Sequence, residues 1–382
     1  MDRTCIAAAR RTPQGRFMGA LKKYSAVELA AIAAKEVLRK VDADDIGQVI
    51  VGNVLMAGQG MNPARQIAVA AGIPIDRPAF TINMMCASGM QAVILAAQAI
   101  KSGEADAVLC GGTESMSGAP YLLDRARQGY RLGDGVLIDS LLSDGLIDTF
   151  EKEHMGLTAE RIAEKYKIKR QEQDEFAYSS HQRYFKALKE KTYEEELVKV
   201  GDLASDEHPR EDTAIDKLGD LKPAFSKGGT VTAGNSSGIN DGAAMLIVCS
   251  ERYALKNGID VLAVLGNSTS IGCDWRLMGL GPVYATRKLC KDNNLKIDDF
   301  DTIELNEAFA AQSLVCIKEL GLDINKVNPD GGAIALGHPI GASGARLIVH
   351  LALRIKRGQS QKTLATLCVG GGMGSAVELA SY

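Results

Sequence analysis

Two cysteines and one histidine in glycine-rich or turn-like surroundings are the residues of this chain best suited to chemistry. Cys86 lies between a strand-like segment and a run with helical periodicity, Cys368 is followed closely by glycines, and His338 follows Gly337. Two thiols and an imidazole are groups that can form a thioester on a protein and break it again. The sequence therefore predicts acyl-transfer chemistry through a cysteine.

The position of Cys86 predicts an activated thiol. Residues 79–83 are strand-like and an apolar helical pattern begins near Gly89, so Cys86 is expected at a strand-to-helix turn, at the positive end of a helix. There the helix dipole and free amides lower the pKa of a thiol and favour the thiolate. Most cysteines are small buried hydrophobic residues, so the prediction depends on the residues that accompany Cys86.

Three further residues complete the predicted catalytic set. His338, as a neutral imidazole, could take the proton of Cys86, although a histidine on a surface loop is an equal alternative. The glycine run that begins at Gly370 has amides that no side chain obstructs, and these could face a developing oxyanion. Asn306 could position a water or a carbonyl, although asparagine is also common in turns.

Composition limits the classes of protein to which the chain can belong. Its 382 residues exceed one ordinary core, which favours two or three domains, and 46% apolar with 24% charged residues is typical of a soluble globular protein. A net charge of −3 gives no reason to expect nucleic acid or an anionic membrane as partner. Eight scattered cysteines without zinc spacing predict free thiols in a reducing compartment and no metal site. With no visible targeting segment and no long apolar run, a cytoplasmic location is expected.

Alternating strand and helix patterns predict an α/β core interrupted by an insertion. Expected strands at residues 4–9 and 48–54 flank an expected helix at 27–39, and the alternation continues to about residue 117. From about residue 119 the chain is richer in charge and tyrosine, with helix-like stretches at 158–166 and 171–191 and no clear strand alternation. The predicted domains are an N-terminal half at 1–118 completed by 241–261, a largely helical lid at 119–240, and a C-terminal half at 262–382.

An internal repeat relates the two halves. Residues 87–103 align without a gap on residues 342–358, and seven of the 17 positions are identical. Each stretch is followed by an apolar strand that ends in cysteine and glycine. Duplication is the economical explanation, although two α/β halves can also resemble each other by composition alone. A site shared by the halves is expected at the seam between them.

Together these segments resemble the thiolase family, and the resemblance covers nearly the whole chain. The segments that carry it are residues 11–17, 111–117, 154–160, 232–243, 306–309, 332–346 and 368–374. Each is moderately specific, and their joint presence in this order is very specific. The resemblance implies the thiolase fold, an α/β fold in which two duplicated halves form a five-layer α-β-α-β-α stack with an inserted lid.

The resemblance also implies a reversible ping-pong Claisen condensation of two acetyl-CoA to acetoacetyl-CoA and CoA. Cys86, deprotonated by His338, would carry the acetyl group, and Cys368 would abstract the α-proton of the second acetyl-CoA. One oxyanion hole would combine His338 with a water held by Asn306, and the other would use the amides of Cys86 and Gly370. No metal or organic cofactor is implied, because coenzyme A is part of substrate and product.

For coenzyme A binding the resemblance points to Arg210 and Ser237, with His154 and Met155 near the pantetheine and acyl end. From the residues alone, an exposed charge on the lid is the alternative for Arg210. In the family, a histidine at position 154 and a methionine at Met278 accompany short-chain, acetoacetyl-type substrates. Family members are dimers or tetramers, so a homo-oligomer is expected, with a tetramer favoured.

Three other functions compete with this interpretation. A degradative thiolase for longer 3-ketoacyl-CoA substrates is disfavoured by His154. A non-catalytic CoA-binding or scaffold protein would have no need of Cys86, Asn306, His338 and Cys368 together. A decarboxylative ketoacyl synthase of the same superfamily would carry histidine or asparagine where this chain has Cys368.

The chain departs from the family pattern at three places. Ala87 follows the predicted nucleophile where most relatives have glycine, and Lys222 replaces a commoner arginine. The extra methyl of Ala87 is expected to leave the thiol functional. Residues 272–276 are atypical, which leaves open how this loop shapes the acyl pocket.

Overall fold

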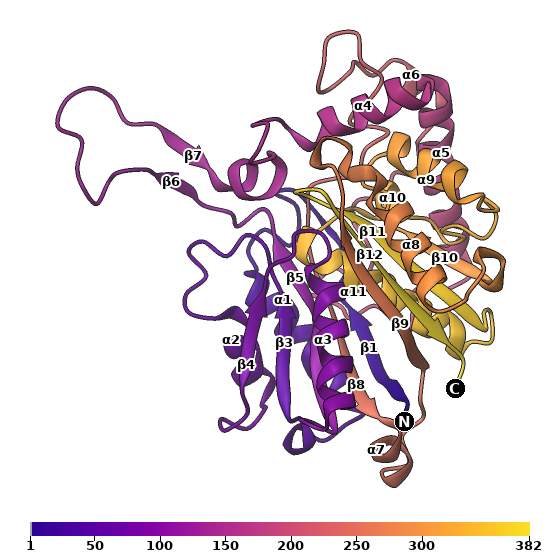
Figure 1. Ribbon diagram of the computed structural model, residues 1–382. Coiled ribbons are helices and arrows are strands. Elements are labelled where there is room, and N and C mark those ends of the chain that lie inside the picture. Colours follow the sequence, from indigo (N-terminus) through magenta and orange to yellow (C-terminus); the bar gives the residue numbers. More distant parts are fainter. Residues whose placement is uncertain (1) are drawn as a thin grey trace.

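The computed structural model of the protein, which describes residues 2–382, is built on a large mixed β-sheet (Figure 1). The N-terminal half contributes β1 (Thr4–Arg11), β2 (Gly15–Arg16), β3 (Gln48–Gly52), β4 (Ala79–Ile82), β5 (Ala107–Ser115) and β8 (Asn240–Ser250). The C-terminal half contributes β9 (Ala263–Gly272), β10 (Thr302–Leu305), β11 (Lys362–Val369) and β12 (Met373–Ala380). Hydrogen-bonded neighbours follow the order β10-β11-β12-β9-β1-β8-β5-β3-β4, with β2 beside β8.

Helices cover both faces of each half and fill the space between the halves. The helices of the two halves are α1 (Ala26–Val37), α2 (Pro63–Ala71), α3 (Ser88–Ser102), α7 (Glu251–Lys256), α8 (Gly281–Asp292), α9 (Ala310–Leu320), α10 (Ala333–Leu336) and α11 (Ile340–Lys356). Helices α1 and α2 contact the strands of the N-terminal half, α8 contacts those of the C-terminal half, and α3 and α11 contact strands of both. The predicted α-β-α-β-α layers are therefore present.

The two sheet layers are continuous rather than separate. β1 pairs antiparallel with β9 through Thr4, Cys5 and Ile6, and this short ladder joins the strands of the two halves. Beyond Ile6, β1 continues its pairing with β8 only. Helix α11 contacts both β1 and β9, so the two halves diverge around the central helices.

The predicted repeat corresponds to two equivalent helices that pack against each other. Residues 87–103 form α3 and residues 342–358 form most of α11, and the strands that follow them are β5 and β11. A Cβ atom added at Gly89 would lie 2.8 Å from the carbonyl oxygen of Gly341, and one added at Gly344 would lie 2.7 Å from the Cβ of Met90. The repeated glycines therefore allow the two helices to cross closely.

Local sequence signals explain where individual helices begin. Ser25 caps α1 in a capping box, since its side chain accepts from the Glu28 amide while the Glu28 carboxylate accepts from the Ser25 amide. The expected helix at 27–39 is therefore confirmed with slightly earlier bounds. His154 caps α4 (Met155–Tyr166) through its Nδ1, which accepts from the amide of Gly156.

The predicted lid is helical in its second part, with a β-hairpin in its first. Its helices are α4, α5 (Arg170–Lys189) and α6 (Ile215–Gly219), preceded by a π-helical turn at Leu142–Leu146. β6 (Tyr121–Leu123) and β7 (Leu137–Asp139) form a hairpin that projects from the body of the molecule (Figure 1). The sequence shows no clear strand alternation here, because three-residue strands are too short to produce an alternating pattern. The boundaries at residues 118 and 240 stay a prediction.

A buried ion-pair network ties the lid to the core. The guanidinium of Arg11 contacts Glu196 and Asp206 at 2.6 Å each, and the imidazole of His350 on α11 lies 3.0 Å from both Glu196 and Asp330. Burial opposes the charged form of His350, but the surrounding carboxylates raise its pKa to about 9. Charges buried this deeply stabilise the fold only while all partners remain in place.

None of the helices within residues 2–382 is long and apolar enough to cross a membrane.

Candidate active site

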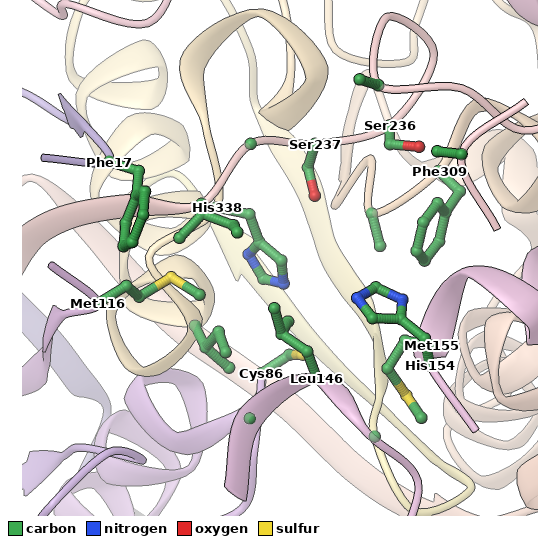
Figure 2. A pocket seen from close by; sticks show the side chains of 18 of the residues that line it. Phe17, Cys86, Met116, Leu146, His154, Met155, Ser236, Ser237, Phe309 and His338 are labelled. Carbon is green, nitrogen blue, oxygen red and sulfur yellow. The ribbon is translucent and has the colours of Figure 1, made fainter. Parts of the chain in front are cut away.

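A cavity of about 460 Å³ lies between the lid and the two halves of the core. Its walls include residues from the end of β11, the start of α11, the turn before α3 and the lid (Figure 2). Eight of the nine predicted site residues line it, namely Cys86, His154, Met155, Arg210, Ser237, His338, Cys368 and Gly370. Residues that lie far apart in the chain are thus brought to one place.

Asn306 is the predicted site residue that does not line the cavity. It directly follows β10, is fully buried, and its amide N–H donates to Thr366 on the neighbouring strand β11. Neither side-chain polar atom of Asn306 has a hydrogen-bond partner among the described residues. Its proposed task of holding a water stays a prediction.

The turn that carries Cys86 has the predicted strand-to-helix form. β4 ends at Ile82 and α3 begins at Ser88, and between them Met85 adopts a left-handed backbone with φ of 46°. The Ser88 hydroxyl donates to the carbonyl oxygen of Met85 at 2.7 Å and accepts from the amide of Met84 at 2.8 Å. This serine therefore braces the turn on which the thiol sits.

Burial has the largest effect on the pKa of the Cys86 thiol. It raises the pKa of the thiol to about 11, although the backbone amide of Gly370 acts in the opposite direction. The net shift of this pKa is therefore opposite to the expected one, although the backbone amides act in the expected direction. A buried neutral thiol needs an adjacent base at the moment of attack.

His338 lines the same cavity, and its tautomer is fixed by Ser343. The Ser343 hydroxyl donates to the carbonyl oxygen of Pro339 at 2.7 Å, so its oxygen accepts from Nδ1 of His338, 2.6 Å away. Nδ1 then carries the proton and Nε2 is left unprotonated, with no hydrogen-bond partner within residues 2–382. Burial, followed by the charge of Arg346, lowers the pKa of His338 to about 4, which keeps the imidazole neutral.

Ser343 and Ser88 were missed at the sequence level, although the signal for them was present. Both are the serine of the repeated Ala-Ser-Gly, one in each half. One braces the turn of Cys86 and the other orients His338.

Glu114 is a third missed residue that shapes the site. Its buried carboxylate accepts from the amides of Val54, Leu55 and Gly341 at 3.0–3.1 Å. The contact with Gly341 holds the beginning of α11, three residues after His338. Burial raises the pKa of Glu114 to about 7.

Cys368 lies at the end of β11 and is fully buried at the cavity wall. Burial, and then the neighbouring Cys86, raise its pKa well above the ordinary thiol value. The glycines that follow form the turn to β12, in which Gly371 and Gly372 have φ of 83° and 82°. Such angles favour glycine. The turn therefore gives these glycines a structural reason, in addition to the predicted one that their amides are free to face an oxyanion.

The charge of the cavity wall favours an anionic ligand. Arg16 and Arg210 line the cavity, and none of the lining residues that the structure describes carries a carboxylate. Burial first, and then the nearby Arg210, lower the pKa of His208 to about 4. Ser237 and apolar side chains line the same cavity, which suits a long ligand that is charged at one end and apolar in part.

His154 is stacked and oriented rather than free. Its ring lies 4.7 Å from that of Phe225, at an interplanar angle of 24°. Because its Nδ1 accepts from the Gly156 amide, a neutral ring carries its proton on Nε2. Burial lowers the pKa of His154, so the neutral form is favoured. Figure 2 shows the imidazoles of His154 and His338 projecting into the same cavity.

Further lining residues had not been singled out from the sequence: Phe17, Met116, Leu146, His208, Phe225 and Phe309. Phe17 and Phe309 lie within segments that carry the family resemblance, so the signal for them was available. Phe225 and His208 come from loops of the lid whose path a single sequence does not determine.

Comparison with known proteins agrees with this arrangement. The family model for the N-terminal domain of thiolases matches residues 4–252, and the model for the C-terminal domain matches residues 259–381. The chain belongs to the thiolase family.

Related thiolases are similar over their whole length. An acetyl-CoA acetyltransferase of Chromobacterium violaceum is 49% identical over 383 residues, which covers 97% of this chain and 98% of the relative. An acetyl-CoA acetyltransferase of Pseudomonas aeruginosa is 46% identical and covers 100% of both chains. The crystal structure of the Bacillus anthracis acetyl-CoA acetyltransferase has a TM-score of 0.97 at 42% identity, covering 100% of this chain and 99% of the other. Human mitochondrial 3-ketoacyl-CoA thiolase in complex with CoA also has a TM-score of 0.97, at 41% identity over 100% and 98% of the chains.

Proposed function

We propose that this thiolase is an acetyl-CoA C-acetyltransferase that interconverts two acetyl-CoA with acetoacetyl-CoA and CoA. The observation that carries the proposal is one cavity in which two thiols and a neutral imidazole line a wall free of carboxylates. The similarity to acetyl-CoA acetyltransferases over the full chain supports the same activity.

In the first half-reaction, Nε2 of His338 takes the proton of Cys86 and the thiolate attacks the carbonyl carbon of acetyl-CoA. A bond forms between Sγ and the acetyl carbon, the bond to the CoA sulfur breaks, and CoA leaves with the proton that His338 carries. The amides of Cys86 and Gly370 are suited to stabilise the oxyanion of this intermediate. The Gly370 amide already acts on the Cys86 sulfur in the resting protein.

In the second half-reaction, Cys368 passes its own proton to Nε2 of His338 and then takes the α-proton of a second acetyl-CoA. The resulting enolate attacks the acetyl group on Cys86, so that a carbon–carbon bond forms and the thioester bond breaks. The released thiolate of Cys86 takes up the proton held by His338, so no net proton is consumed. A thiolate with a pKa raised by burial is a strong base, which suits Cys368 to this step. His338 and a water held by Asn306 would stabilise the enolate.

Arg210 and Ser237 are proposed to bind coenzyme A, with His154 and Met155 beside the pantetheine and acyl groups. All four line the cavity, and Arg210 supplies a positive charge for a phosphate group. No step requires a metal or an organic cofactor. The homo-oligomeric state and the cytoplasmic location stay predictions.

A chain-length series tests the proposal against its main competitor. Thiolysis rates are measured for 3-ketoacyl-CoA substrates of four, six and eight acyl carbons. The proposal predicts the highest kcat/KM for acetoacetyl-CoA, falling by roughly tenfold or more for the six-carbon substrate. A kcat/KM that rises with length would favour a degradative 3-ketoacyl-CoA thiolase, and no turnover of any substrate would favour a non-catalytic CoA-binding protein.

A further inference from the structure

The atypical loop at residues 272–276 contains the single tryptophan of the chain, Trp275, which does not line the cavity. We propose that Trp275 is a positioning residue. It fixes the distance between the lid and the C-terminal half beside Cys368, and it thereby restricts the length of the acyl group that the cavity accepts. The inference rests on the proposed function, because it concerns the acyl substrate of the same site. Its evidence is a set of contacts that joins the lid to the C-terminal half.

On the lid side, a short turn ends at His154. Ile147 and His154 pair as an isolated β-bridge and close the turn. Inside it, the carboxylate of Asp148 accepts from the amides of Phe150 at 2.9 Å and Glu151 at 2.7 Å. These hydrogen bonds fix the conformation of the turn. Phe150 and Glu151 lie at its tip, and the bridge between Ile147 and His154 forms its base.

On the other side, Trp275 begins the 3-10 helix η3 (Trp275–Leu280), which contains the cavity residue Met278. The loop that precedes η3 is fixed to the turn after Cys368, since the amide of Cys273 donates to the carbonyl oxygen of Gly372 at 2.7 Å. A Cβ atom on Gly372 would lie 2.7 Å from the Cα of Trp275, so the two backbones are in close contact.

Trp275 joins these two parts. Its ring centroid lies 4.8 Å from that of Phe150, and its indole N–H donates to the carboxylate of Glu151 at 3.1 Å. These two contacts are here called the clasp. The guanidinium of Arg276, itself paired with Asp274 at 3.0 Å, lies 5.7 Å from the centre of the indole. Trp275 thus has partners from the lid as well as from its own loop.

The clasp lies outside the apolar cluster that closes this part of the cavity. In that cluster Met155 of the lid packs with Met278 of η3 and with Cys368. Met155 directly follows His154, and Figure 2 shows both at the cavity. His154 also closes the turn that Trp275 contacts. A longer acyl chain would have to separate Met155 from Met278, and the clasp opposes that separation. Packing contacts of this kind discriminate between substrates that differ by methylene groups.

The inference is tested by the ratio of kcat/KM for 3-ketohexanoyl-CoA to that for acetoacetyl-CoA. Trp275→Ala is expected to raise this ratio roughly fivefold or more. Trp275→Phe keeps a ring against Phe150 and is expected to raise it less than twofold. Tyr284→Ala, which removes a half-exposed aromatic ring of α8 outside the cavity and the clasp, serves as the matched control and should leave the ratio unchanged. The ratio does not depend on the fraction of active protein, so partial unfolding of a variant does not mimic the effect.

Hydrogen exchange of the amides at residues 147–154 is the second readout, and exchange is expected to be faster in Trp275→Ala than in the wild type and in Tyr284→Ala. A ratio that is unchanged or lower in Trp275→Ala would overturn the inference while leaving the proposed function intact. Unchanged exchange in Trp275→Ala would show that the clasp does not hold the turn and so does not cause a change in the ratio. If the wild type turned over neither substrate, the proposed function would fail and the specificity inference with it, whereas hydrogen exchange would still decide whether Trp275 holds the turn.

Discussion

Ser343 and His338 form a hydrogen bond of 2.6 Å between Oγ and Nδ1, and a second bond from the same hydroxyl to Pro339 determines its direction. The hydroxyl has one proton, and because that proton is given to the carbonyl oxygen, the imidazole must supply the other. One serine thereby determines which nitrogen of His338 faces the cavity without a proton.

Removal of this serine should therefore impair catalysis more than stability. In Ser343→Ala the Nδ1–H loses its acceptor, so the opposite tautomer, which presents a proton to Cys86, becomes accessible. A decrease in kcat of roughly 10- to 100-fold for acetoacetyl-CoA thiolysis is expected. Ser88→Ala is the informative comparison, because it removes the equivalent serine of the other half. It should weaken the turn of Cys86 without affecting the tautomer of His338, so only Ser343→Ala should change the pH profile of kcat/KM. Identical profiles would contradict the assignment of the tautomer.

The contact between the start of α11 and β5 should be intolerant of a single methyl group at Gly341. A Cβ atom there would lie 2.6 Å from the carbonyl oxygen of Thr113 and 2.9 Å from the carboxylate of Glu114. Gly341→Ala is therefore expected to lower the free energy of unfolding by about 2–4 kcal/mol, since the close neighbours are backbone and a fixed carboxylate.

Gly219→Ala in α6 is the matched control, because no atom lies within 4 Å of the added Cβ. It should change stability by less than about 1 kcal/mol. Urea unfolding of both variants and the wild type provides the comparison. Equal stability of the two variants would show that α11 can shift away from β5 to admit the methyl group.

The network around His350 should make stability depend on pH. Its folded pKa of about 9 lies above the ordinary value of 6.5, so the protonated imidazole stabilises the fold. This contribution is fully present below pH 6.5 and is lost as the pH rises through about 9. His350→Gln is accordingly expected to be destabilised by about 3–5 kcal/mol at pH 6, and by less at pH 9.5. Melting temperatures of wild type and variant at the two pH values give the result, and a difference that grows with pH would have the wrong sign.

Cys368 should be required for the carbon–carbon bond step but not for acetyl transfer to Cys86. In Cys368→Ala, His338 and Cys86 are unchanged, so transfer of the acetyl group from acetyl-CoA to Cys86 should continue. Formation of acetoacetyl-CoA should fall by roughly 10³-fold or more, because no base is left to take the α-proton. Chromatography of the products measures the second effect and intact mass the first. A variant that still condensed acetyl-CoA at near the wild-type rate would show that another group takes the α-proton.

The turn of Cys86, the repeat and the glycine-rich segments around His338 and Cys368 could be predicted because each is encoded locally. A strand pattern, a helical pattern and glycine are visible within about twenty residues. The repeat also indicated that the two halves would meet at a shared seam, and the structure places α3 of one half against α11 of the other.

The properties that sequence reasoning missed depend on residues far apart in the chain. The pKa of Cys86 is raised because parts of the lid and of both halves enclose the sulfur, which no local pattern shows. The clasp of Trp275 joins segments more than 120 residues apart, and its indole contact with Glu151 is visible only once the lid is folded onto the core. Asn306 does not line the cavity, and its buried position follows from the pairing of β10 with β11, which no local pattern shows.

Covalent catalysis through Cys86 is tested most directly by intact mass spectrometry after brief exposure to acetyl-CoA, comparing the wild type with Cys86→Ser. We expect one added acetyl group on the wild type, mapped to Cys86 and absent in the variant. No adduct on the wild type, under conditions in which CoA demonstrably binds, would contradict covalent catalysis and leave a CoA-binding protein with the thiolase fold.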